Sequence, residues 1–167
     1  MLFDRDLSAD EQAAFEAEKE GHYREISKNA LVPMPGLLDL LEALGRHGIA
    51  VGLATSAPPE NVAHTLAEAG LADRFAAIAR GDQVKHGKPA PDVFLHAASL
   101  LGVEPTACLA FEDAPLGVAS ARNAGMCCVA VTSTFSADAL MAAAPPPHAT
   151  CRDFSDFLDG PGRWLRA

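Results

Sequence analysis

Residues 107–131 read ACLAFEDAPLGVASARNAGMCCVAV. The run over 107–111 is apolar and predicts a buried strand, and the run over 126–131 predicts a second one. The residues between them, 114–124, have the composition of a helix, which Gly125 closes. Apolar strands without polar alternation, joined by a helix, are typical of a parallel sheet with helices on both faces. This stretch therefore predicts an α/β fold of the Rossmann-like type.

The same alternation of strand and helix extends through most of the chain. Ser8 and Glu11 form a capping box at the start of the first expected helix. A Pro/Gly break over 33–36 separates a helical appendage from the α/β body. Further strands are expected over 49–55 and 75–79 and after residue 149, and further helices over 8–28, 37–48, 59–70, 91–101, 136–143 and 154–158.

The length and charge of the chain limit its function. The chain has 167 residues and a formal net charge of -9, and this length suits a single domain. An acidic protein whose basic residues are scattered repels phosphate backbones, so we expect no nucleic-acid partner. We find no apolar run of about 18 residues and no secretory signal, so we expect no membrane span and a cytoplasmic location. No sequence feature assigns an oligomeric state.

The four cysteines have no CxxC spacing. Cys127 and Cys128 are neighbours in an apolar run, where successive side chains point to opposite faces of a strand. We expect buried, reduced thiols, with disulfides or metal ligation as the alternatives.

Two segments offer groups that can bind a phosphate. Lys88 lies in the segment 87–92, GKPAPD, where two prolines stiffen the loop. A lysine held in this way can neutralise a phosphate, and a solvated surface charge is the alternative interpretation. Thr55 and Ser56 directly follow an expected strand and offer a hydroxyl and backbone N–H groups at the start of a helix. An ordinary helix N-cap is the alternative there.

Glu112 and Asp113 place two adjacent carboxylates at the end of the strand expected over 107–111. Their repulsion is tolerated when a cation lies between them and a phosphate, and oxygen ligands of this kind suit Mg²⁺. Negative charge at a helix N-terminus is the alternative. Together with the phosphate-binding groups, these acids follow strands that we expect in one sheet, at the edge where ligands collect. The combination indicates phosphoryl transfer.

These segments together resemble the haloacid dehalogenase superfamily of phosphatases and phosphomutases, in its beta-phosphoglucomutase-like branch with a helical cap. The segments 52–56 (GLATS), 87–92 (GKPAPD) and 111–117 (FEDAPLG) are similar to the second, third and fourth motifs of that family. The resemblance covers roughly residues 31–145.

The resemblance implies a set of site residues and one cofactor. The implied phosphate-binding residues are Thr55, Ser56 and Lys88, with Lys88 also stabilising charge in catalysis. The implied ligands of the Mg²⁺ ion are Asp113 and Glu112.

The first motif of the family is an apolar strand that runs into Asp-x-Asp, and here the chain departs from the pattern. The only candidate is Asp4-Arg5-Asp6, with Asp4 as the nucleophile and Asp6 as the general acid/base. Asp4 lies only 51 positions before Thr55, which is short for a member with a full helical cap. We therefore interpret residues 1–30 as the remaining back half of the cap and residues 31–167 as the core, in a member that lacks its N-terminal portion.

We accordingly expect a haloacid dehalogenase-like hydrolase that acts on a small phosphorylated metabolite as a phosphatase or phosphomutase. Intact relatives work through Mg²⁺ and an aspartyl-phosphate, and we expect weak or no turnover from this chain. The alternatives are a non-catalytic phosphate-binding remnant, an active enzyme that uses Asp4 and Asp6, and a fragment of a longer enzyme. Such a fragment would expose sheet edges and self-associate through them.

Overall fold

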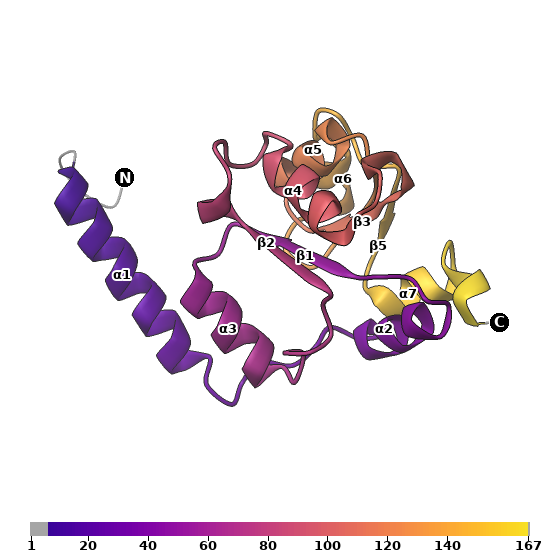
Figure 1. Ribbon diagram of the computed structural model, residues 1–167, viewed down its shortest axis with the longest axis horizontal. Coiled ribbons are helices and arrows are strands. Elements are labelled where there is room, and N and C mark those ends of the chain that lie inside the picture. Colours follow the sequence, from indigo (N-terminus) through magenta and orange to yellow (C-terminus); the bar gives the residue numbers. More distant parts are fainter. Residues whose placement is uncertain (1–6, 167) are drawn as a thin grey trace.

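The computed structural model describes residues 7–166, so Asp4 and Asp6 lie outside the described residues. Helices and strands follow one another in the predicted order (Figure 1). The helices are α1 (Ala9–Ile26), α2 (Leu37–Arg46), α3 (Pro59–Glu68), α4 (Asp92–Leu101), α5 (Pro115–Asn123), α6 (Ala137–Met141) and α7 (Phe154–Asp159). The strands are β1 (Gly52–Thr55), β2 (Ala77–Arg80), β3 (Leu109–Glu112), β4 (Cys127–Val131) and β5 (Ala149–Cys151). The predicted α/β class with parallel strands is confirmed.

The strands are shorter than the apolar runs that predicted them. The run over 49–55 yields β1 only from Gly52, and the strand expected over 75–79 is β2 at Ala77–Arg80. In the parallel pair, Gly52 lies opposite Ala77 and Thr55 lies opposite Arg80. The pairing partner therefore sets the limits of each strand, and a single apolar run does not contain this information.

Within residues 7–166, the strands form two parallel sheets rather than one. β1 pairs with β2, while β4 pairs with both β3 and β5. Within the described residues, the site motifs therefore follow strands of two sheets and not of the single sheet that the sequence led us to expect. Within residues 7–166, no strand pairs with both β1 and β3, so one edge of each remains without a partner strand there.

Helices cover both faces of the strands and join the two sheets. Cys128 of β4 packs in a core cluster with Val93 of α4 and Ala79 of β2. The next residue of β4, Val129, points to the opposite face and packs in a second cluster with Leu40 of α2. A third cluster joins α2 and α3 to β1 and β2. The packing of α4 on one face and α2 on the other thus fixes how the two sheets lie.

Helix α1 stands apart from the sheets and lies beside α3 (Figure 1). Its start is as predicted, with Ser8 and Glu11 in a capping box. None of its residues is buried, and polar contacts such as Tyr23 Oη to Thr65 Oγ1 (3.1 Å) join it to α3. The interpretation of residues 1–30 as a cap remnant stays a prediction. In the part of the chain that the structure describes, no helix is long and apolar enough to cross a membrane.

The cysteines are free thiols. The expectation that they are buried is confirmed for Cys128 and Cys151 and is wrong for Cys127, which is exposed, and for Cys108, which is partly buried. Cys127 is exposed and Cys128 is buried, which confirms that they point to opposite faces of β4. Burial raises the pKa of Cys128 to about 12 and that of Cys151 to about 11. Both buried thiols are therefore protonated at neutral pH, which disfavours them as nucleophiles.

Candidate active site

The carboxyl ends of β1 and β3 open into one cleft of about 650 Å³. Clefts at the carboxyl ends of parallel strands are the usual ligand sites of open α/β sheets. The structure brings together here all the predicted site residues that fall within residues 7–166. They are Thr55, Ser56, Lys88, Glu112 and Asp113.

Thr55 ends β1 with its hydroxyl free to donate a hydrogen bond. Its Oγ1 accepts the backbone N–H of Ala57 at 3.0 Å, so the hydroxyl proton can be offered to a phosphate oxygen. Helix α3 starts at Pro59 after Pro58, and neither residue has a backbone N–H. The start of the helix therefore offers fewer backbone N–H donors than the sequence led us to expect. The hydroxyl groups of Thr55 and Ser56 are thus the more important hydrogen-bond donors to a phosphate at this position.

Lys88 and Glu112 form an ion pair at the floor of the cleft. Lys88 Nζ contacts Glu112 Oε1, and the two side chains are only 17% and 8% exposed. The same nitrogen lies 5.1 Å from the centroid of the Phe94 ring, a cation–π contact. Because Lys88 is held by a carboxylate and a ring, its interpretation as a solvated surface charge is wrong.

Glu112 is the most unusual carboxyl group of the site. It leaves the end of β3 and packs against Gly117 in the first turn of α5. Burial raises the pKa of Glu112 above its usual value; Lys88 opposes this effect and the charge of Asp113 adds to it. Since Glu112 is turned toward Lys88, its role as a metal ligand stays a prediction.

The loop that carries Lys88 is tied to α5 by two side chains that were not predicted from the sequence. Ser120 Oγ donates to the carbonyl oxygen of Ala90 at 2.6 Å, and Asn123 Nδ2 donates to that of Pro89 at 3.0 Å. Ser120 is fully buried. Because the burial of Ser120 and both contacts with the loop depend on the fold, no sequence signal identified these residues.

The carboxylate of Asp113 accepts hydrogen bonds from two hydroxyl groups in the segment that follows β4. Its Oδ2 accepts Thr134 Oγ1 at 2.6 Å and Ser133 Oγ at 3.4 Å. Neither hydroxyl was selected from the sequence. The pairing of β3 with β4, which places Glu112 opposite Ala130, brings the residues after both strands together.

Comparison with known proteins agrees with this geometry. The haloacid dehalogenase-like hydrolase family matches residues 2–125. The chain belongs to this family.

Individual members of the haloacid dehalogenase-like family are similar over part of their length. Fructose-1-phosphate phosphatase YqaB of Escherichia coli is 41% identical over 114 residues, which are 68% of this chain and 59% of YqaB. Beta-phosphoglucomutase of Bacillus subtilis is 40% identical over 98 residues, which are 59% of this chain and 42% of that enzyme. The chain thus spans about half the length of these relatives.

A solved structure of a haloacid dehalogenase-like hydrolase shows the same fold. The hydrolase of family IA, variant 3, from Entamoeba histolytica superposes with a TM-score of 0.85 at 26% identity. The superposition covers 98% of this chain and 75% of that one. The overall arrangement of helices and strands is therefore shared with an experimentally determined haloacid dehalogenase-like hydrolase.

The donor atoms of the cleft suit the Mg²⁺ that this family generally uses. Among the described residues, no group of three or more His, Cys, Asp or Glu side chains is placed to hold a metal. Asp113 Oδ1, however, has no hydrogen-bond partner within residues 7–166. Mg²⁺ is usually held by one or two carboxylates, water and the phosphate of the substrate. Asp113 fits such a site, with Glu112 beside it.

The nucleophile of the family is not among the described residues of the cleft. The carboxylates that line it within residues 7–166 are Glu112 and Asp113, and Glu112 is committed to Lys88. The hydroxyl of Thr55 contacts a backbone N–H and no base. The candidates Asp4 and Asp6 lie outside the described residues.

Proposed function

We propose that this chain binds the phosphate group of a small phosphorylated metabolite, as part of a phosphatase or phosphomutase. The single observation that carries the proposal is the convergence of Thr55, Lys88 and Asp113 on one cleft. They come from three separate segments of the chain and supply a hydroxyl donor, a positive charge and a carboxylate. The relatives named for fructose-1-phosphate and phosphoglucose chemistry support a phosphorylated sugar as the substrate class.

The side chains have distinct roles in this proposal. Thr55 and Ser56 donate hydrogen bonds to phosphate oxygens, and Lys88 neutralises their charge. Glu112 holds Lys88 in place, because a long side chain that is paired and mostly buried cannot sample many rotamers. Asp113, with Glu112 nearby, would hold Mg²⁺, which supplies further neutralisation of the phosphate charge.

The chemical step requires a nucleophile, for which Asp4 is the candidate in the sequence, with Asp6 as the acid/base. We propose that turnover by the 167-residue chain is weak, because the described residues of the cleft offer no activated nucleophile. A non-catalytic phosphate-binding protein is the second candidate function. The same observation favours it, since binding needs only the residues that are already in place.

The experiment measures Mg²⁺-dependent phosphate release from p-nitrophenyl phosphate by the whole chain, together with calorimetric binding of inorganic phosphate. We expect the chain to bind phosphate. Thr55→Val should weaken this binding by about tenfold, which corresponds to the free energy of one hydrogen bond to a charged group. Turnover that Asp4→Asn abolishes would establish the enzyme. Binding without turnover would establish the non-catalytic protein, and no phosphate binding by the folded chain would refute both.

A further inference from the structure

Thr134 makes the closest hydrogen bond to Asp113. The distance from Thr134 Oγ1 to Asp113 Oδ2 is 2.6 Å, against 3.4 Å from Ser133 Oγ to the same oxygen. An ionised carboxylate can only accept, so both hydroxyls donate. A separation of 2.5 to 2.7 Å is typical of a hydroxyl bound to a charged oxygen. Thr134 is therefore the principal partner of this carboxylate among the described residues.

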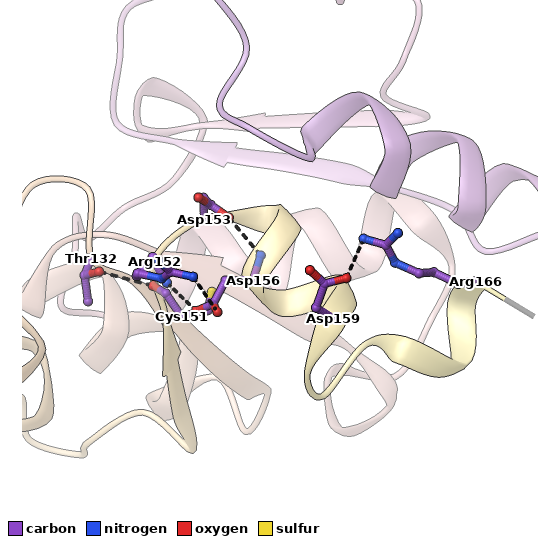
Figure 2. Close-up of polar contacts among 7 residues, drawn as sticks. All are labelled: Thr132, Cys151, Arg152, Asp153, Asp156, Asp159 and Arg166. Atoms are coloured by element: carbon purple, nitrogen blue, oxygen red, sulfur yellow. Dashed lines mark hydrogen bonds and ion pairs between the residues drawn. The ribbon is translucent and has the colours of Figure 1, made fainter.

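The segment that carries Thr134 is fixed at both ends. At one end, the backbone N–H and Oγ1 of Thr132 both donate to the carbonyl oxygen of Cys151 in β5, at 2.9 and 3.3 Å (Figure 2). At the other end, Ser136 caps α6 through the N–H of Ala139 at 3.3 Å. Helix α6 is itself anchored by Leu140, which is fully buried. Thr134 is thus held in position by the sheet and by a packed helix.

Thr134 does not line the cleft, whereas Asp113 and Ser133 do. Thr134 therefore reaches the cleft through the side chain that it contacts, Asp113. By holding Oδ2, the hydroxyl fixes the rotation of the carboxylate and leaves Oδ1 without a partner within residues 7–166. A carboxylate held by one oxygen presents the other in a defined direction, which is how outer partners orient metal ligands.

We propose that Thr134 is a positioning residue that orients Asp113 toward a divalent cation. This inference rests on the proposed function, because it assumes that Asp113 holds Mg²⁺. It adds a residue from a separate segment, after β4, to the determinants of the site. The alternative is a purely structural role, in which the hydrogen bond between Thr134 and Asp113 only ties the segment 132–136 to β3. A structural role and a positioning role predict different effects of mutating Thr134.

The test compares Mg²⁺ binding by the whole 167-residue chain and its variants, measured by calorimetry. Thr134→Val removes the hydroxyl donor at nearly constant side-chain volume. We expect Mg²⁺ affinity to fall about tenfold, which is the smallest loss usual when a residue that holds a metal ligand is mutated. Thr134→Ser keeps the hydroxyl and should restore affinity to within about twofold. Thr106→Val is the matched control, since Thr106 is exposed before the opposite end of β3.

Two further measurements separate positioning from structural support. We expect Thr134→Val to keep the thermal midpoint and the affinity for inorganic phosphate in the absence of Mg²⁺, because Thr55 and Lys88 bind the phosphate. Parallel losses of stability and phosphate binding would overturn the proposal in favour of a structural role. Mg²⁺ affinity equal to that of the unaltered chain would also overturn it. No Mg²⁺ binding by the unaltered chain would instead refute the metal site of the proposed function, and this inference with it.

Discussion

The carboxylate of Glu112 occupies the space that a side chain at Gly117 would fill. A Cβ atom built on Gly117 would lie 2.0 Å from Oε2 of Glu112 and 2.3 Å from its carboxyl carbon. The absence of a side chain in the first turn of α5 therefore lets the carboxylate fold back from β3 to reach Lys88. Gly117 thus makes room for the carboxylate that pairs with the lysine of the cleft.

Gly117→Ala is expected to displace Glu112 and loosen Lys88. Insertion of a methyl group into a packed site costs about 1–3 kcal/mol, and the freed lysine should bind inorganic phosphate more weakly. Urea unfolding and calorimetry measure the two effects. Gly45→Ala is the control, because a Cβ there meets nothing within 4 Å, and alanine in a helix should raise stability by about 0.5–1 kcal/mol. Wild-type phosphate affinity in Gly117→Ala would contradict the role assigned to this glycine.

Ser120→Ala is expected to destabilise the loop over 87–91. It removes the donor to the carbonyl of Ala90 at a fully buried position, and an unsatisfied buried acceptor costs about 1–3 kcal/mol. Urea unfolding should show this loss, and phosphate affinity should fall with it because the loop carries Lys88. Ser99→Ala, at an exposed site of α4, should change neither quantity. Equal effects of the two variants would show that the loop does not depend on Ser120.

Glu112 makes a contribution to the stability of the folded chain that decreases as the pH rises. Burial raises the pKa of Glu112 in the folded state above its ordinary 4.5, so between these two pKa values the folded chain binds more protons than the unfolded chain. The free energy of unfolding therefore falls as pH rises through this window. This contribution is complete below pH 4.5 and lost above the folded-state pKa.

Comparison of the unaltered chain with Glu112→Gln isolates that component. Urea unfolding of both proteins between about pH 4 and 7 gives the difference in stability at each pH. We expect the advantage of the unaltered chain to shrink as pH increases. A growing advantage would mean that attraction to Lys88 outweighs the burial of the carboxyl group.

The order and type of the helices and strands were predictable because they depend on local patterns. The capping box of Ser8 and the apolar runs of β3 and β4 are examples. The direction of Glu112 was not predictable, because it depends on contact with Lys88, 24 positions away in the sequence. The contact of Thr134 with Asp113 likewise depends on the register of β3 against β4. Sequence patterns therefore selected residues that line one cleft, but the contacts among their side chains required the structure.

Cys127 is expected to be the first thiol of the native chain to react with iodoacetamide at pH 8. It is exposed, whereas Cys128 and Cys151 are buried with pKa values of about 12 and about 11, so they remain protonated at this pH. Mass spectrometry of peptides after timed labelling measures the order of reaction. Denaturant should make the buried thiols react as well. Early labelling of Cys128 in the native chain would contradict the burial of this face of β4.

The unpaired edges of β1 and β3 predict self-association. Within residues 7–166, β1 pairs only with β2 and β3 only with β4, so each presents backbone N–H and C=O groups that can pair with another chain. Sedimentation velocity between about 1 and 100 μM should show mass that increases with concentration. Leu109→Lys places a charge on β3, where Leu109 is 45% exposed, while Leu100→Lys changes a 51% exposed site on α4 and serves as the control. A charge on an edge strand opposes pairing, so only Leu109→Lys should reduce association. A monomer at every concentration, or equal effects of both variants, would show that these edges do not bind another chain.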